Sequence, residues 1–346
     1  MDALPEQNHE RRRPTIRDVA SAAGVSTATV SNVLRGTRFV GPDLQEKVRH
    51  AIATLGYRPN SLAAGLRERR SRMIGIVVPD ITSGFFSAVL RRIEDLAAVG
   101  NYQILLADSQ ENTERETERI SALARRQADG LILFPCSDNP SALDEVRESQ
   151  IPTVIVDRVF RDPELDDVSA DNFAAAQLGT EHLLSLGHKE ILLAASDLRI
   201  NNIVERVNGY ETALVAAGLG GRQQIFEAGN RSETAYKAVK RRLQEGPRPT
   251  AIFALTHLVA LGALRAIWEL QIRFPEELSL LAFDDVDWMT ALRPFVSTLQ
   301  QPIDELATEA WSTLMRRLDG NNDERRHLRF PCRLMVREST VPCQQR

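Results

Sequence analysis

The segment between Thr15 and Asn32 is rich in short polar side chains whose types and spacing suit contact with nucleic acid. Small hydroxyl groups donate to phosphate oxygens and set the position of a protein on DNA without reading its sequence. Asn can form two hydrogen bonds with adenine, and the methyl group of Thr or Ala can touch that of thymine. We therefore expect phosphate contacts from Thr15, Ser26, Thr29 and Ser31, and base contacts from Thr27, Ala28, Ser31 and Asn32. For each residue taken singly, an ordinary capping or surface role is the alternative.

Three short helices must position these side chains. Apolar residues recur at helical spacing from residue 16 to 23, and Gly24 supplies a turn at little steric cost. Ser26 is a suitable N-cap for a second helix, and a third runs from near Pro42 to Gly56. Two short helices joined by a tight glycine turn form a helix-turn-helix, whose second helix enters the major groove. We expect this domain to span residues 14–58, after a disordered tail of residues 1–13.

The charge of the chain is unevenly distributed. Residues 1–72 contain 13 basic and 7 acidic side chains, a net charge of +6, whereas the rest carries −10 of the total of −4. A basic head on an acidic body is typical of a nucleic-acid-binding protein with a separate regulatory or catalytic body. A solvated surface of mixed charge is the plainer reading of the same counts.

Length and composition exclude several classes of protein. A chain of 346 residues suggests two or three domains, and 43% hydrophobic residues indicate a globular protein. No apolar run is long enough to cross a membrane or resembles a signal peptide, so we expect a cytoplasmic protein. The three cysteines lack metal-ligand spacing, and no nucleophile-elbow, phosphate-loop or zinc-protease motif is present. We therefore expect neither a catalytic site nor a metal or cofactor.

The order of motifs in the head resembles one family. The stretch TIRDVASAAGVSTATVSNVL, followed by VRHAIATLGYRPN, is similar to the start of the LacI/GalR family of bacterial repressors, and the similarity continues to about Ser339. The resemblance implies a homodimer that binds a palindromic operator in double-stranded DNA and regulates transcription under the control of a small molecule. It adds Tyr57 to the expected DNA contacts.

Residues 59–72 resemble the hinge helix and linker of that family. The resemblance implies DNA contacts from Asn60, Ala63 and Leu66, with Leu66 wedged into the minor groove. Such apolar wedges unstack a base step and bend the duplex. A linker helix in which Leu66 merely packs is the alternative.

From Met73 onward, short apolar runs alternate with amphipathic stretches. This alternation predicts parallel sheets covered by helices on both faces, so the fold class is α/β behind an all-α head. The runs are too numerous for one ordinary doubly wound domain. We expect a core at residues 73–339, with one lobe at about 73–168 plus 297–326 and a second at about 169–296 plus 327–339, before a tail at 340–346. The resemblance implies a core like that of periplasmic binding proteins, with a ligand between the lobes.

Matching the family motifs in order gives the expected effector contacts: Phe85, Phe86, Arg158, Asp171, Arg206, Arg231, Thr256 and Asp284. Arg206 suits a ligand hydroxyl or carboxylate because its guanidinium offers five donors in a rigid fork. An inter-lobe salt bridge is the alternative for Arg206 and Asp284, and core packing for the two phenylalanines.

Two departures from the family pattern bear on the effector. Thr256-His257 stands where Asn-Asp is usual, and Arg231 stands at a position often filled by an aromatic residue. Together with Arg158 and Arg206, Arg231 predicts a positively biased pocket and an anionic or sugar-derived effector. Two alternatives remain open: a constitutive repressor with a degenerate pocket, and a solute-binding protein or sugar-processing enzyme that shares only the core fold.

Overall fold

The computed structural model describes residues 14–35, 38–57, 70–137, 140–158 and 162–344. The chain divides into two compact units, Met1–Ser71 and Arg72–Arg346, and each is described by itself. The expected fold class, a helical head and a two-lobed α/β core with parallel sheets, is confirmed. The tail of residues 1–13 and the hinge positions Asn60, Ala63 and Leu66 lie outside the described residues.

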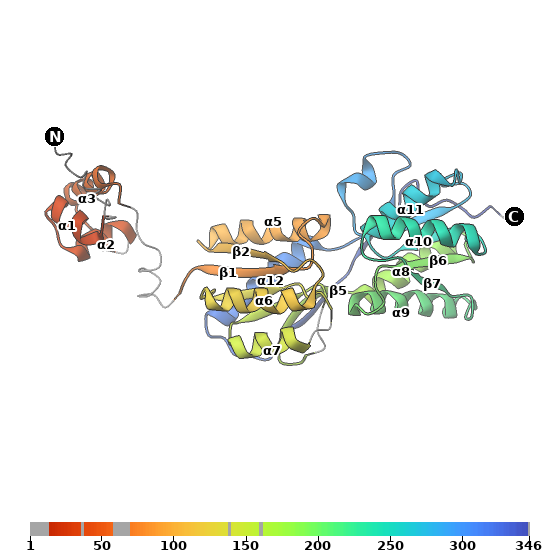
Figure 1. The fold of residues 1–346 in the computed structure, drawn as a ribbon, viewed down its shortest axis with the longest axis horizontal. Helices are drawn as coiled ribbons and strands as arrows, with labels where there is room; N and C mark the ends of the chain where they lie inside the picture. The colour runs from red at the N-terminus through yellow and green to blue at the C-terminus, as the bar shows by residue number, and fades with distance from the viewer. Residues whose placement is uncertain (1–13, 36–37, 58–69, 138–139, 159–161, 345–346) are drawn as a thin grey trace, which may run out of the picture. The chain divides into compact units, whose positions relative to one another are not determined.

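The head is a three-helix unit (Figure 1), with α1 at Ile16–Ala23, α2 at Thr27–Arg35 and α3 at Pro42–Leu55. Gly24, which ends α1, has a φ of 66°, a left-handed conformation that glycine adopts without a steric penalty. The three helices enclose a small core of buried apolar side chains: Val19, Ala20, Ala23, Val30, Val48 and Ala51.

The first lobe of the core is a six-stranded parallel sheet with helices on both faces. Its order is β11-β5-β4-β3-β1-β2, with β1 at Met73–Val78, β2 at Gln103–Asp108, β3 at Gly130–Leu133, β4 at Thr153–Val156, β5 at Asp166–Ala170 and β11 at His327–Phe330. One face packs on α5 (Gly84–Val99) and α12 (Ile303–Leu318), and the other on α6 (Thr113–Arg125) and α7 (Pro140–Ser149). Strands β1, β3 and β4 are almost fully buried because both faces are covered.

The second lobe repeats this plan. Its sheet order is β12-β10-β9-β8-β6-β7, with β6 at Ile191–Ala195, β7 at Gln224–Glu227, β8 at Ala251–Ala254, β9 at Ser279–Phe283, β10 at Ser297–Gln300 and β12 at Arg333–Met335. Only the pairing of β10 with β12 is antiparallel among the described strands. Helices α8 (Asn172–Ser185) and α9 (Asn201–Ala216) cover one face, and α10 (Ser232–Glu245) and α11 (His257–Glu269) the other.

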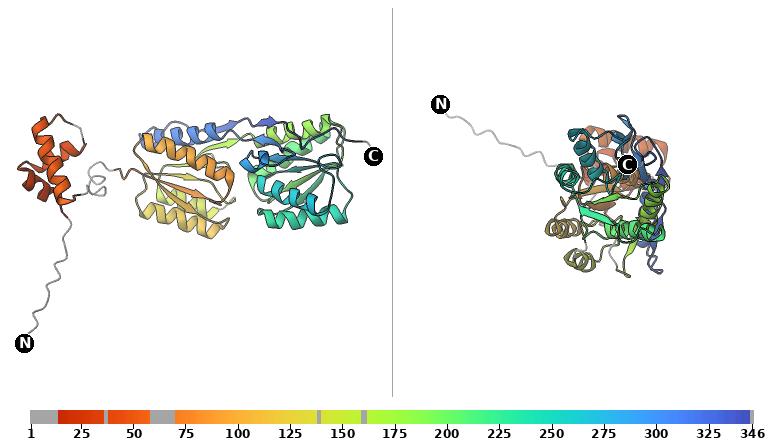
Figure 2. Two further views of the ribbon diagram at one scale, coloured as in Figure 1. Left: turned by 90° about the horizontal axis from the view of Figure 1, so that it is seen from above. Right: turned by 90° about the vertical axis from the view of Figure 1, so that its right-hand side faces the viewer.

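The chain crosses between the lobes three times, along one side of the core (Figure 2). Two crossings lie later in the sequence than expected. Residues 297–300 form β10 of the second sheet rather than part of the first lobe, because Leu299 is fully buried in the second lobe's core. Residues 327–330 form β11 of the first sheet, where they extend the ladder of β5. The expected division of the C-terminal region between the lobes was therefore wrong by one strand at each of these two crossings.

Residues 340–343 are bound to the second lobe, so the expected tail from residue 340 was wrong for this segment. Thr340 is buried, and the backbone N of Val341 donates to Ser279 Oγ at 3.1 Å. The carbonyl oxygen of Val341 accepts from His188 Nε2 at 3.0 Å, and the backbone N of Cys343 donates to Leu186 O at 2.7 Å. These backbone groups find partners on the lobe surface, which a polar composition alone does not reveal.

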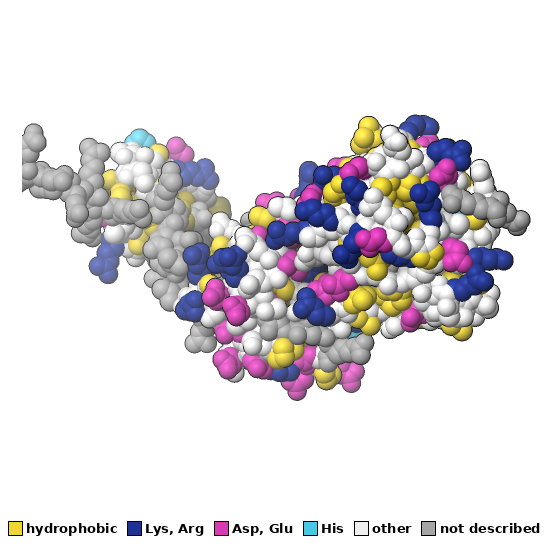
Figure 3. Space-filling model, turned by 45° about the vertical axis from the view of Figure 1, so that its right-hand side comes forward, with side chains coloured by type: hydrophobic (Ala, Val, Ile, Leu, Met, Phe, Trp, Pro, Cys, Tyr) yellow, Lys and Arg dark blue, Asp and Glu magenta, His cyan; other side chains and the backbone are white. Residues whose placement is uncertain are grey.

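Basic and acidic side chains are interspersed over the face of the core shown in Figure 3, and they form no continuous basic band there. Among the ion pairs of the second lobe, Arg265 pairs with Glu233 at 2.6 Å, and Lys237 pairs with the same carboxylate at 3.3 Å. Within the described residues, no helix combines the length and apolar character that a membrane crossing requires.

Candidate functional site

The exposed side of α2 carries the head's candidate base-reading residues. Ser26 Oγ accepts a hydrogen bond from the backbone N of Thr29 at 3.1 Å, which caps the helix. Val30 is fully buried, so the opposite side of the helix faces solvent. Thr27 and Ala28 are exposed, and Ser31 and Asn32 are partly exposed. The N-terminal half of α2 therefore offers hydrogen-bonding and methyl groups to a partner.

Two further expected DNA contacts, besides Ser26, have structural roles in the head. Thr15 Oγ1 donates to Asp18 Oδ2 at 2.8 Å, and the backbone N of Thr15 donates to the same oxygen at 2.7 Å. In this capping box the hydroxyl proton of Thr15 is already donated to Asp18, whereas a phosphate contact would need the same proton. Tyr57 is half-buried and packs against the head's apolar core.

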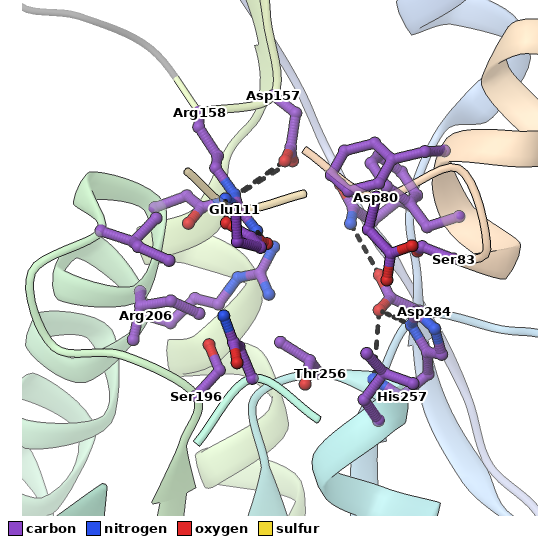
Figure 4. A pocket seen from close by; sticks show the side chains of 18 residues that line it. Asp80, Ser83, Glu111, Asp157, Arg158, Ser196, Arg206, Thr256, His257 and Asp284 are labelled. Atoms are coloured by element: carbon purple, nitrogen blue, oxygen red, sulfur yellow. Dashed lines mark hydrogen bonds and ion pairs between the residues drawn. The ribbon is translucent and has the colours of Figure 1, made fainter. Parts of the chain in front are cut away.

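A pocket lies between the two lobes of the core, at the carboxyl ends of the strands, where ligands bind in open α/β sheets. Figure 4 shows Arg158, Glu111 and Arg206 gathered at one side of this space, and Asp80, Asp284 and His257 at the other. Its lining side chains are Asp80, Ser83, Phe85, Phe86, Glu111, Asp157, Arg158, Ser196, Ile200, Asn202, Ile203, Arg206, Asn230, Thr256, His257, Leu258, Asp284 and Gln301.

The apolar wall of the pocket comes from the start of α5. The rings of Phe85 and Phe86 meet edge to face with centroids 5.3 Å apart, and Phe86 packs likewise on Phe134 at 5.5 Å. Both residues are buried in the core of the first lobe and also line the pocket. The two phenylalanines therefore pack in the core and also line the pocket, and their contact with an effector stays a prediction.

Arg158 is neutralised within the first lobe. Its Nη1 and Nη2 donate to the two carboxylate oxygens of Glu111 at 2.7 and 2.8 Å, and Nη1 also donates to Cys136 O at 2.9 Å. Burial is the largest single influence and lowers the pKa of this guanidinium, but the hydrogen bond and the charge of Glu111, together with Asp157, outweigh burial and raise the pKa. Arg158 therefore lines the pocket as half of a neutral ion pair.

Asp284 is a pocket carboxylate that accepts three hydrogen bonds. Its Oδ2 accepts from His257 Nδ1 at 2.8 Å and from the backbone N of His257 at 3.2 Å, and its Oδ1 accepts from Gln301 Nε2 at 2.7 Å. Burial alone would raise its pKa, but these donors and Arg206 lower the pKa to about 2. Asp284 is ionised at neutral pH.

Asp157 directly follows β4 and is buried with fewer hydrogen-bond partners than Asp284. Its two carboxylate oxygens share Asn202 Nδ2, at 3.3 Å each. Burial raises the pKa of Asp157 to about 6, although Arg206 and Arg158 act in the opposite direction. A ligand that donates hydrogen bonds would supply what this carboxylate lacks.

Arg206 lies on α9 and is 2% exposed. Its Nε donates to Asn172 Oδ1 at 2.8 Å and its Nη1 to Leu255 O at 2.6 Å, while the guanidinium lies 3.7 Å over the ring of Phe283. Burial lowers the pKa of this group, partly offset by Asp284 and Asp157. Framework contacts thus hold the guanidinium in place at the pocket.

Two expected pocket residues lie elsewhere. Arg231 is exposed in the N-cap position of α10, and its neighbour Asn230 lines the pocket. Asp171 caps α8 by accepting from the backbone N of Ala174 at 3.0 Å. The expected positive bias is therefore wrong, since four carboxylates and two guanidiniums line the pocket.

Several lining residues were not among the sequence candidates: Asp80, Glu111, Asp157, Asn202, His257 and Gln301. Asp157 directly precedes Arg158 at the end of a predicted strand, so its position was the available signal. Glu111 and Gln301 carry no comparable signal, because each lies in an irregular segment. Within the described residues, no group of three or more His, Cys, Asp or Glu could hold a metal ion.

Comparison with known proteins matches both units. Residues 15–60 match the model of bacterial regulatory proteins of the lacI family, and residues 180–340 match a periplasmic binding protein-like domain. The catabolite control protein A of Priestia megaterium is 31% identical over 94% of this chain and 99% of its own length.

Solved structures agree. The lac repressor dimer bound to operator and the anti-inducer ONPF has a TM-score of 0.86 and 26% identity, over 95% of this chain and all of that one. A LacI family transcriptional regulator from Enterococcus faecium with bound ribose has a TM-score of 0.72 and 29% identity, over 79% of this chain and all of that one. The chain belongs to the lacI family of bacterial regulatory proteins and is a DNA-binding transcriptional regulator, not an enzyme.

Proposed function

We propose that the chain acts in the cytoplasm as a homodimeric repressor of a palindromic operator, released or engaged by a small hydrogen-bond-donating molecule in the inter-lobe pocket. A two-fold dimer places one head on each half-site. The operator-bound dimer of the lac repressor supports this arrangement. The bound ribose of the Enterococcus faecium regulator supports a sugar or sugar-derived ligand.

One observation carries the ligand-controlled reading: both lobes contribute charged groups to a single pocket. Asp157 and the Arg158–Glu111 pair come from the first lobe, and Arg206 and Asp284 come from the second. A ligand that contacts both sets bridges the lobes, so its binding free energy depends on how far they are closed. Such coupling between ligand and operator is reciprocal and typically amounts to ~1–3 kcal/mol.

On DNA, α2 is proposed to lie in the major groove with Thr27, Ala28, Ser31 and Asn32 facing the bases. Selection of bound DNA from a random pool by the full-length chain gives the operator. The variant Asn32→Ala should then relax the preference at one position of each half-site by ~1–3 kcal/mol. Thr54→Ala on α3 is the control and should leave the selected site unchanged.

Ligand control is tested on the same operator by fluorescence anisotropy. A panel of monosaccharides and their derivatives is titrated, and at least one should change the operator Kd by about 5- to 150-fold. Arg206→Met should abolish that response because the variant removes the pocket guanidinium. Arg199→Met should retain the response, since Arg199 lies on the surface and pairs with Asp197.

A constitutive repressor is the second candidate, and His257 favours it. The ring and backbone N of His257 already donate to Asp284, which occupies acceptor positions that a ligand hydroxyl would use. If no compound of the panel changes either the operator Kd or the melting temperature, this second candidate replaces the ligand-controlled one.

A further inference from the structure

Two buried side-chain oxygens of the pocket have no hydrogen-bond partner within the described part of the chain. They are Asn202 Oδ1 and Gln301 Oε1, on residues that are each 5% exposed. Buried polar atoms are rarely left in this state, because each has given up its hydrogen bonds to water without a replacement. Both residues line the inter-lobe pocket.

The orientation of each amide is fixed by the carboxylate next to it. Asn202 Nδ2 donates to both oxygens of Asp157, and Gln301 Nε2 donates to Asp284 Oδ1 at 2.7 Å. Turning either amide over would set its oxygen against a carboxylate oxygen, which is repulsive. Each amide therefore presents an acceptor to its surroundings, and a ligand must bring the donors.

The charge of the pocket is negative. The carboxylate of Glu111 is paired with Arg158, which leaves those of Asp80, Asp157 and Asp284 with the single guanidinium of Arg206. Even with His257 counted as a cation, the carboxylates remain in excess. Removal of water on ligand binding strengthens the attraction of such a site for a positive charge.

We propose that the effector carries a protonated amine, which donates to the carboxylate of Asp157 and to Asn202 Oδ1, as in an amino sugar or an amino polyol. This inference rests on the proposed ligand-controlled function and narrows the class of ligand. An ammonium brings several donors and no acceptor, whereas a hydroxyl brings one donor and two acceptor lone pairs.

The electrostatics of Asp157 agree with this assignment. Burial raises the pKa of its carboxyl to about 6, and the charges of Arg206 and Arg158 and the amide of Asn202 at 3.3 Å offset this only in part. A cation beside it would favour the ionised form and lower that pKa. Asp284 is already supplied with donors by His257 and Gln301, so Asp157 is the carboxylate in need of one.

The test uses matched pairs of compounds that differ by one amine in place of one hydroxyl: D-glucosamine with D-glucose, D-galactosamine with D-galactose, and 1-amino-1-deoxy-sorbitol with sorbitol. Calorimetry on the full-length protein, slightly below neutral pH, measures the Kd of each compound. In at least one pair we expect the amine to bind about tenfold more tightly than its hydroxyl partner, equivalent to 1.4 kcal/mol.

Variants locate the amine. Asp157→Asn should reduce the preference within that pair to about one, and Asn202→Ala should reduce it in part. Arg231→Ala is the matched control, because Arg231 is exposed outside the pocket, and should keep the full preference. A preference that survives Asp157→Asn would overturn the assignment.

The remaining outcomes separate this inference from the proposed function. If a hydroxyl compound binds as tightly as its amine partner, the amine proposal is wrong and the ligand-controlled repressor stands. If no member of any pair binds at millimolar concentration, the amine proposal also fails. Operator release by another compound of the panel would still support ligand control.

Discussion

Asp157 and Asp284 occupy equivalent places in the two lobes and behave in opposite ways. Each directly follows the fourth strand of its lobe in chain order, β4 or β9. Each is buried, and each has a left-handed backbone, with φ of 68° and 69°. Yet the pKa of Asp157 is raised to about 6 and that of Asp284 is lowered to about 2. Repeated backbone geometry therefore does not fix the charge of the side chain that it presents.

The strand that pairs with β4 or β9 explains why the two pKa values differ. Three residues after β8 ends, the backbone N of His257 donates to Asp284 at the start of α11. Three residues after β3 ends, the backbone N of Cys136 donates instead to the buried carboxylate of Glu116 at 2.6 Å. The first lobe thus uses the equivalent donor for Glu116, and Asp157 is left with the amide of Asn202.

The largest effect on stability is expected at Asp284, where a substitution should separate the two carboxylates most clearly. Asp284→Asn should lower the free energy of unfolding by about 3 kcal/mol, because the backbone N and ring of His257 and the amide of Gln301 lose a charged acceptor while buried. Asp157→Asn should cost less than 1 kcal/mol at neutral pH, since it removes a poorly paired charge. Urea unfolding measures both. Equal losses in the two variants would show that the two carboxylates are alike.

A second prediction sharpens the comparison through pH. The folded pKa of Asp157 lies above its ordinary value of 3.8, so its contribution to stability is present below pH 3.8 and is lost as pH rises through about 6. From pH 5 to 7.5 the native chain should lose ~1.4 kcal/mol relative to Asp157→Asn, because that range covers about one pKa unit of the shift. Asp284 has the opposite sign: its contribution is present above pH 3.8 and is lost as pH falls through about 2. Parallel curves for the native chain and Asp157→Asn would contradict this assignment.

A third prediction concerns the helix that supplies donors to Asp284. Thr256 Oγ1 accepts from the backbone N of Val259 at 3.3 Å and caps α11. Thr256→Ala should lower the free energy of unfolding by about 1 kcal/mol, and Thr256→Ser should recover most of it. Thermal unfolding of the two variants checks this, and a loss retained in the Ser variant would mean that the methyl group matters more than the cap.

The smallest effect is expected on the surface. Arg199 and Asp197 pair at 2.7 Å, but the arginine side chain is 84% exposed. Arg199→Met should leave the unfolding free energy unchanged within experimental error, because exposed pairs are screened by water. A larger loss in urea unfolding would give this pair a structural role that its exposure does not predict.

Much of the architecture could be predicted from the sequence because its signals are local. The helices of the head follow from apolar spacing and from Gly24 and Gly56, and the strands β1, β3 and β8 are short apolar runs. The boundary near residue 327 was misplaced because β11 and β12 are only partly buried and lack such runs. The boundary near residue 297 was misplaced because β10, although buried, has the sequence STLQ with a single apolar residue.

The sequence by itself determined the class of fold, the three helices of the head and six of the eight expected pocket residues. The tertiary structure alone decided the charge of the pocket. Glu111 neutralises Arg158 across 47 residues, His257 binds Asp284 across 27, and Arg231 lies on the surface at the start of a helix. The physical reason is that secondary structure follows from neighbouring residues, whereas ionisation depends on partners and burial that folding brings together.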